Sequence, residues 1–178
     1  GDEWVGFLRE LTDIGDLRAH KEWGGSGINF EPRGSHLEPH LDFTNKYEGW
    51  RRVNILFFLS SKGWKKEWGG YAENFKKNDN EIGYKLVNSY KPEYNSLVIF
   101  SASDTSYHGF DIVRCPEDEA RIAITAYYYS NERGPHTKGS GMTKYVGWDE
   151  DRKKDPDYSG RKGTDLKKLG EEKEGETQ

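Results

Sequence analysis

The stretch "RVNILFFLS" (residues 52–60) is nearly continuous in apolar residues, as a buried strand would be. The stretches "NSLVIFSAS" (95–103) and "RIAITAYYYS" (121–130) repeat this texture with β-branched and aromatic residues. Turn-forming segments separate these stretches, and no helical pattern lies between Ile28 and Ser130. Several short strands without intervening helices predict a mainly β fold, either a sandwich or a barrel.

Different patterns flank this β region on both sides. Apolar residues recur at helical spacing from Trp4 to Ile14, which predicts an amphipathic helix over residues 3–14 that packs on the core. After Arg133 the sequence is charged and rich in Gly, so by itself this extension is expected to be poorly ordered. We therefore divide the chain into an N-terminal helical segment (1–27), a β core (28–133) and a charged C-terminal extension (134–178).

The composition limits the classes of function. Of 178 residues, 33% are charged, and 27 cations against 31 anions leave a net charge of −4, so no basic surface for nucleic acid is implied. A single cysteine, Cys115, excludes an internal disulfide and fits a reducing compartment. No apolar run approaches membrane-spanning length, and the first residues contain no secretion signal. We expect a cytoplasmic globular domain with no nucleic-acid signature and no membrane segment.

The stretch "GSHLEPHLDF" (34–43) contains two pairs of a histidine and a carboxylate, each two residues apart. A helix here is disfavoured, because Pro39 in its interior would cost about 3 kcal/mol. In an extended strand, residues two apart share a face, whereas His36 and His40 would lie about 13 Å from each other. His40 and Asp42 could therefore bind one metal ion, and by spacing alone His36 and Glu38 could do so equally well.

A third candidate ligand sharpens this choice. His108 follows the strand at 95–103, and Arg121 opens the next strand thirteen residues later. Two histidines and one carboxylate form the facial triad of non-haem Fe(II) oxygenases. The ordered pattern of "HLD", "WGG", "HGF" and "RIAITAYYYSNER" resembles the 2-oxoglutarate/Fe(II)-dependent dioxygenases, and most closely their prolyl-hydroxylase branch, which includes the oxygen-sensing and ribosomal prolyl hydroxylases.

The resemblance covers residues 28–133 and implies a double-stranded β-helix, or jelly roll, in a minimal or trimmed form. It also implies that His40, Asp42 and His108 bind Fe(II) and that Arg121 binds the distal carboxylate of 2-oxoglutarate, which makes these four the candidate catalytic residues. A planar guanidinium suits that task because it can bind a carboxylate through two hydrogen bonds.

The remaining candidate residues follow from alternation along the strands. Thr125 and Tyr127 share a face with Arg121, and Asn54, Leu56 and Phe58 share a face of the strand at 52–60. Phe58 and Phe30 stand where the oxygen-sensing relatives carry tyrosines. The resemblance thus implies cosubstrate contacts from Thr125, Asn54 and Phe58 and a substrate pocket of Tyr127, Leu56 and Phe30. For Phe30, Phe58 and Leu56, simple core packing is an equally good interpretation.

The function implied by the resemblance is hydroxylation of an unactivated C–H bond with Fe(II), 2-oxoglutarate and O₂, giving succinate and CO₂. Asp42 favours hydroxylation over halogenation, because related halogenases carry a small residue in its place. The first substrate expected is a peptidyl residue, with proline as the first candidate. Hydroxylation of a free amino acid or another small metabolite and a non-catalytic metal-binding jelly roll remain alternatives. His36 and Glu38 are then expected to face solvent or the pocket rim.

Overall fold

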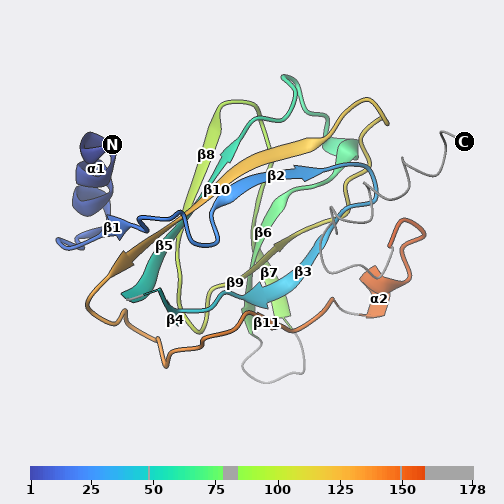
Figure 1. The fold of residues 1–178 in the computed structure, drawn as a ribbon. Coiled ribbons are helices and arrows are strands. Elements are labelled where there is room, and N and C mark those ends of the chain that lie inside the picture. The colour runs from blue at the N-terminus through green and yellow to red at the C-terminus, as the bar shows by residue number, and fades with distance from the viewer. Residues whose placement is uncertain (48, 78–83, 149, 159–178) are drawn as a thin grey trace, which may run out of the picture.

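The computed structural model describes residues 1–47, 49–77, 84–148 and 150–158, which form two antiparallel β-sheets that face each other (Figure 1). In the first sheet, β10 lies between β5 on one side and β1 and β2 on the other. Strands β4 and β8 both pair with β5 along the edge that faces away from β10. The second sheet has the strand order β11-β3-β9-β6-β7. This arrangement confirms the prediction of a mainly β, jelly-roll fold.

The strands and helices have the following bounds. The first sheet consists of β1 (Arg18–Ala19), β2 (Gly27–Glu31), β4 (Asn45–Lys46), β5 (Gly49–Phe58), β8 (Ser96–Ser101) and β10 (Arg121–Ser130). The second consists of β3 (Leu37–Leu41), β6 (Ala72–Lys77), β7 (Tyr84–Tyr90), β9 (Tyr107–Phe110) and β11 (Lys144–Tyr145). The helices are α1 (Asp2–Thr12), the short 3₁₀ helix η1 (Lys66–Trp68) and α2 (Glu150–Lys153). In the part of the chain that is described, no helix is long and apolar enough to cross a membrane.

From Val53 to Phe58, strand β5 is apolar except for Asn54, because both of its faces are covered. On the outer face, Val53 and Ile55 pack against Leu8 of helix α1. On the inner face, Phe58 packs against Ala72 of the second sheet and Ala123 of β10. A strand that is buried on both faces has no need of alternating polar residues.

The N-terminal helix packs on the core as the helical spacing predicts. Leu8 is fully buried, and the Trp4 indole donates a hydrogen bond of 2.7 Å to the Tyr128 hydroxyl on β10. The helix ends at Asp13, whose backbone has the left-handed φ of 54° that commonly terminates helices. Helix α1 therefore covers the outer face of the first sheet.

The described part of the C-terminal extension folds back on the second sheet. Strand β11 pairs with β3, Trp148 is buried, and the Tyr158 hydroxyl donates a hydrogen bond of 2.5 Å to Glu38. Contacts with the sheet thus order a sequence that is too polar to fold alone. Residue 149 and residues 159–178 of the predicted extension lie outside the described residues.

This packing corrects the expectation that His36 and Glu38 face solvent. Their exposed fractions are 1% and 4%, and the His36 ring lies 4.9 Å from the rings of both Trp148 and Tyr158. The sequence around residues 34–43 gives no sign of this burial, because the covering side chains come from more than 100 residues further along the chain.

Candidate active site

Two neighbouring strands and one turn bring the three candidate metal ligands together. His40 on β3 and His108 on β9 are directly paired across the second sheet, and Asp42 follows the end of β3. One ligand atom from each residue lies within 4.8 Å of the others. Among the described residues, this is the one group of three His, Cys, Asp or Glu side chains that meets this condition. The pair His36 and Glu38 is not part of it.

Backbone hydrogen bonds fix both imidazole rings in the state that binds a metal. The Nδ1 atom of His40 lies 2.9 Å from the Glu38 carbonyl oxygen, and that of His108 lies 2.9 Å from the Ser106 carbonyl oxygen. Since a carbonyl only accepts, each Nδ1 carries a proton, and in the neutral form of the ring this leaves Nε2 with its lone pair. Burial and the neighbouring His40 lower the pKa of His108 to about 4, so this ring is neutral near pH 7.

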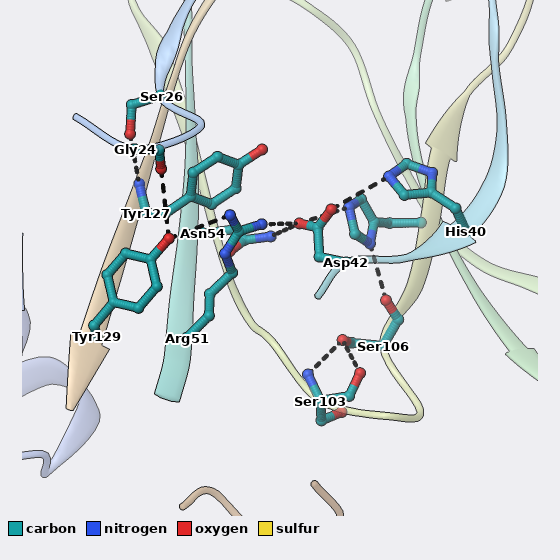
Figure 2. A network of polar contacts seen from close by, with 11 residues as sticks. Gly24, Ser26, His40, Asp42, Arg51, Asn54, Ser103, Ser106, Tyr127 and Tyr129 are labelled. Atoms are coloured by element: carbon teal, nitrogen blue, oxygen red, sulfur yellow. Dashed lines mark hydrogen bonds and ion pairs between the residues drawn. The ribbon is translucent and has the colours of Figure 1, made fainter. Parts of the chain in front are cut away.

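The Asp42 carboxylate lies between the two rings and a polar network on the first sheet (Figure 2). Each histidine Nε2 is 3.6 Å from one of its oxygens. On the other side, the Arg51 guanidinium lies 3.0 Å from Oδ2 and the Asn54 amide donates a 2.6 Å hydrogen bond to the same atom. Burial opposes ionisation of Asp42, but the adjacent His40 and His108 rings and the Arg51 guanidinium outweigh it and hold its pKa well below the usual range.

The donor set fits Fe(II). Two neutral imidazole nitrogens and one carboxylate on one side of an ion form the facial triad, which leaves the remaining coordination positions for other ligands. The hydrogen bonds from each Nδ1 to a backbone carbonyl are the kind of outer contact that orients metal-binding histidines.

A cavity of about 130 Å³ between the sheets begins at the two histidines and reaches Arg121 on β10. Arg121 is 3% exposed, and its Nε donates a 2.7 Å hydrogen bond to the Gly70 carbonyl. Its guanidinium lies over the ring of Phe110, 4.2 Å from the centroid. Burial lowers the pKa of Arg121 to about 10, which still leaves it charged near pH 7. A cation at the inner end of a small cavity suits an anionic ligand such as a carboxylate.

The "WGG" turn makes room for this arginine. Gly70 has a φ of 69°, a left-handed conformation that glycine adopts at little cost. A Cβ atom at this position would lie 3.1 Å from both the Arg121 Cδ and a methyl group of Val113. The second glycine of the turn is therefore required by the close approach of Arg121.

The structure brings most of the predicted pocket residues to this cavity. Asn54 and Leu56 line it from β5, and Thr125 and Tyr127 line it from β10 beside Arg121. Phe58 is fully buried between the sheets, with its ring 5.1 Å from the Arg121 guanidinium. The alternation predicted along both strands is thus present at these positions.

Phe30 is a correction, because its side chain points away from the cavity. It is 49% exposed and lines a hollow on the outer surface with Leu59 and Tyr94. Its neighbours Asn29 and Glu31 line the cavity instead. Since side chains alternate along a strand, Phe30 cannot share their face.

Sequence reasoning missed Arg51, which is 1% exposed and contacts Asp42. Simple alternation from Asn54 would place Arg52 on the inner face. The pairing of β5 with β10 shifts register between Tyr128 and Tyr129, so that Val53 pairs with Tyr128 and Arg51 with Tyr129. This bulge turns Arg51 inward. Its sequence signal is a pair of arginines at the start of an otherwise apolar strand.

Comparison with known proteins agrees with this geometry. Residues 26–129, more than half of the chain, match the family described as the 2OG-Fe(II) oxygenase superfamily. This chain belongs to that superfamily. The resemblance seen in the sequence is confirmed, and Fe(II) and 2-oxoglutarate are the cofactor and cosubstrate that this superfamily and the His-Asp-His triad imply.

Similar proteins include several prolyl hydroxylases. Prolyl 3-hydroxylase OGFOD1 of Mus musculus is 28% identical over 111 residues, which are 58% of this chain and 20% of the relative, so the match spans about a fifth of that protein. A Trichoplax adhaerens prolyl hydroxylase, solved in complex with a hypoxia inducible factor oxygen degradation domain peptide fragment, is 23% identical over 56% of this chain and 40% of that chain, with a TM-score of 0.44. A Pseudomonas putida prolyl-4-hydroxylase is 18% identical over 61% of this chain and 52% of that chain, with a TM-score of 0.40.

The residues of this superfamily member have separate tasks in the site. Bound Fe(II) and 2-oxoglutarate would supply the activation of O₂ and the oxidation of a C–H bond. His40, His108 and Asp42 would hold the metal, and Arg121 would hold a carboxylate at the other end of the cavity. Apolar walls from Leu56 and the rings around Arg121 limit access of water, which strengthens the electrostatic interactions inside.

Proposed function

We propose that this chain hydroxylates a residue within a peptide or protein, with proline as the first candidate. In this reaction a substrate C–H group, O₂ and 2-oxoglutarate give a C–OH group, succinate and CO₂. One oxygen atom enters the new hydroxyl and the other enters the succinate carboxylate. 2-Oxoglutarate supplies the two electrons that the balance requires by losing its carboxyl carbon as CO₂.

The size of the cavity carries this proposal. Sites that enclose drug-sized ligands have volumes of about 300 to 1,000 Å³. The cavity between the triad and Arg121 measures about 130 Å³, which is too small to enclose both 2-oxoglutarate and a second whole molecule. The group to be oxidised must then reach the metal from outside. A side chain on a peptide can do so while the rest of the peptide stays on the surface.

Two further observations favour this function over its alternatives. Arg121 lines the same cavity as the two histidines of the triad, so that its charge can bind the far carboxylate of a ligand that also reaches the metal. A module that only bound metal would not need this second, cationic residue in the cavity. The relative with 28% identity is a prolyl 3-hydroxylase, which supports proline as the first candidate.

Mass spectrometry of peptides tests the proposal directly. The chain would be incubated with Fe(II), 2-oxoglutarate, O₂ and a mixture of proline-containing peptides, beside a mixture of free amino acids. We expect succinate formation together with peptides that have gained one oxygen atom on proline. His40→Ala should abolish both signals. His136→Asn should retain them, because His136 is exposed, lies outside the cavity and has a φ of 53° that asparagine tolerates.

Each contrary outcome points to a named alternative. Oxygen incorporation into free amino acids but not into peptides would contradict the peptide substrate and support the small-molecule hydroxylase. Metal binding without any binding or turnover of 2-oxoglutarate would contradict the oxygenase and support the non-catalytic jelly roll.

A further inference from the structure

Arg51 is a fully buried cation on the far side of Asp42 from the two histidines. Its guanidinium is enclosed by two rings, with the Phe43 centroid at 3.7 Å and the Tyr127 centroid at 3.5 Å. Figure 2 shows the Tyr127 ring beside Arg51. One terminal nitrogen, Nη1, lies 3.0 Å from Asp42 Oδ2, and the other, Nη2, donates a 3.3 Å hydrogen bond to the Tyr129 hydroxyl. A guanidinium between two rings and a carboxylate has little freedom to move, since each contact fixes a different direction.

The two oxygens of Asp42 have different surroundings. Oδ2 receives both the Arg51 guanidinium and the 2.6 Å hydrogen bond from the Asn54 amide. A carboxylate oxygen has about two lone-pair sites, so these two donors occupy Oδ2. Oδ1 is 3.6 Å from the His40 Nε2 and receives neither donor. The His108 Nε2 lies 3.6 Å from Oδ2. The carboxylate therefore has one oxygen, Oδ2, that is held by two protein donors beside His108, and one oxygen, Oδ1, that faces His40 and receives neither donor.

We propose that Arg51 is a positioning residue, which together with Asn54 makes Asp42 a metal ligand through a single oxygen and fixes its orientation. The stacking of Phe43 and Tyr127 on Arg51 keeps this arrangement rigid. The inference rests on the proposed function, because it takes the triad as the metal site of an oxygenase. A carboxylate that binds through one oxygen leaves more coordination positions for other ligands than one that binds through two.

A purely structural role for Arg51 makes a different prediction. Arg51 also contacts Tyr129, and its Nη2 would lie 3.3 Å from a Cβ atom placed on Gly25, so it contributes to packing of the loop before β2. If packing were its whole role, substitutions would lower the unfolding temperature but would leave metal affinity unchanged in the protein that remains folded.

Metal affinity in the absence of turnover separates the two roles. Co(II) binding to the metal-free full chain would be measured by calorimetry for the unaltered protein, Arg51→Lys, Arg51→Met and Arg52→Met. Arg52→Met is the matched control, because Arg52 neighbours Arg51 on the same strand but bonds the Ser130 hydroxyl and the Glu132 carbonyl instead of Asp42. The unfolding temperature of each metal-free variant would be recorded alongside.

We expect the two Arg51 variants to bind Co(II) about 10- to 100-fold more weakly, as is typical when a residue that orients a metal ligand is lost. Arg52→Met should keep the affinity of the unaltered protein. Arg51→Lys carries the test if Arg51→Met does not fold, because lysine keeps the charge but lacks the planar fork. Unchanged Co(II) affinity in folded Arg51→Lys, or an equal loss in Arg52→Met, overturns the proposal.

A second measurement distinguishes this result from failure of the proposed function. Anaerobic addition of Fe(II) and then 2-oxoglutarate to the unaltered protein should give a visible charge-transfer band, which should shift or weaken in Arg51→Lys. If the unaltered protein binds Co(II) but gives no band, the oxygenase function fails while the Co(II) affinities still decide the role of Arg51. If the unaltered protein binds no Co(II), both the oxygenase function and the role of Arg51 are overturned.

Discussion

Glu31 and Arg121 stand directly opposite each other on the paired strands β2 and β10, and both side chains line the cavity. Directly opposed residues in an antiparallel pair have Cβ atoms about 4.5–5.5 Å apart. The carboxylate of Glu31 acts to raise the pKa of Arg121, against the larger effect of burial. The cation at the inner end of the cavity thus has a protein anion as its neighbour before any ligand binds.

Glu31→Gln is expected to tighten the binding of 2-oxoglutarate. A dicarboxylate that reaches Arg121 must approach Glu31, and unit charges a few Å apart at a protein surface interact by about 1 to 4 kcal/mol. Removing one negative charge should therefore increase affinity roughly tenfold, which corresponds to about 1.4 kcal/mol. Calorimetric titration of the Mn(II)-loaded protein with 2-oxoglutarate measures this change.

Glu132→Gln is the control for Glu31→Gln, because Glu132 is exposed and does not line the cavity. It should leave the affinity for 2-oxoglutarate unchanged. Weaker binding by Glu31→Gln would contradict the electrostatic argument and would mean that Glu31 contributes a favourable contact to the ligand.

Arg121→Met is expected to weaken both ligand binding and folding stability. Removing the buried partner of a charged ligand costs about 2–5 kcal/mol of binding free energy. The affinity for 2-oxoglutarate should therefore fall at least about 30-fold. The metal-free protein should also unfold at a lower temperature, because removal of Arg121 leaves the buried Glu31 carboxylate without its neighbouring cation and the Gly70 carbonyl without its donor. Calorimetry and thermal unfolding give the two readouts. Unchanged affinity for 2-oxoglutarate would contradict the role of Arg121.

Asp111 is expected to make folding stability depend on pH. Burial and the neighbouring Glu73 raise its pKa from 3.8 to about 6. An acid with a raised pKa in the folded state contributes stability below the unfolded pKa, and this contribution is lost as pH rises through the folded value. Between about pH 4 and pH 7 the unfolding free energy of the unaltered protein should fall by about 1–3 kcal/mol relative to that of Asp111→Asn. Urea unfolding at several pH values measures the difference, and parallel curves for the two proteins would contradict it.

The sequence was sufficient for the features that depend on local patterns. Strands β8 and β10 each lie within a predicted stretch, and β5 overlaps the stretch 52–60 but begins three residues earlier, because long apolar and β-branched runs indicate strands by themselves. Strand alternation left the pair His40 and Asp42 and the pair His36 and Glu38 equally possible, and the resemblance to the dioxygenases selected the first pair. His108 could be added because an oxygenase triad needs a third ligand in that order along the chain.

The features that sequence reasoning missed depend on pairing between distant segments. Phe30 faces outward because the pairing of Glu31 with Arg121 fixes which face of β2 turns inward. Arg51 faces inward because the pairing of β5 with β10 skips Arg52, and the sequence of β5 does not reveal this register shift. His36 is buried because Trp148 and its neighbours fold back over it. A strand sequence alone determines the alternation of side chains but not which set points inward.

The ion pair of Glu73 and Arg152 joins the C-terminal extension to the second sheet. Glu73 on β6 is 5% exposed, and the Arg152 guanidinium binds both of its oxygens, with Nη2 2.9 Å from Oε1. Removing one partner leaves a buried charge without its counter-ion, which costs up to about 3–5 kcal/mol when both are buried. Because the Arg152 side chain is 32% exposed, we expect Arg152→Met to cost about 1–3 kcal/mol of unfolding free energy.

A double-mutant cycle tests whether this pair holds the extension in place. Glu73→Gln should also destabilise the protein, and the combination with Arg152→Met should cost less than the sum of the two, with a coupling of about 0.5–3 kcal/mol. Urea unfolding provides all four values. Lys154→Met is the control, since Lys154 forms an exposed pair with Asp151 and should change stability by less than about 0.5 kcal/mol. Additive effects of the two substitutions would show that the extension is held by its apolar contacts, such as those of Trp148, and that the ion pair adds no net stability.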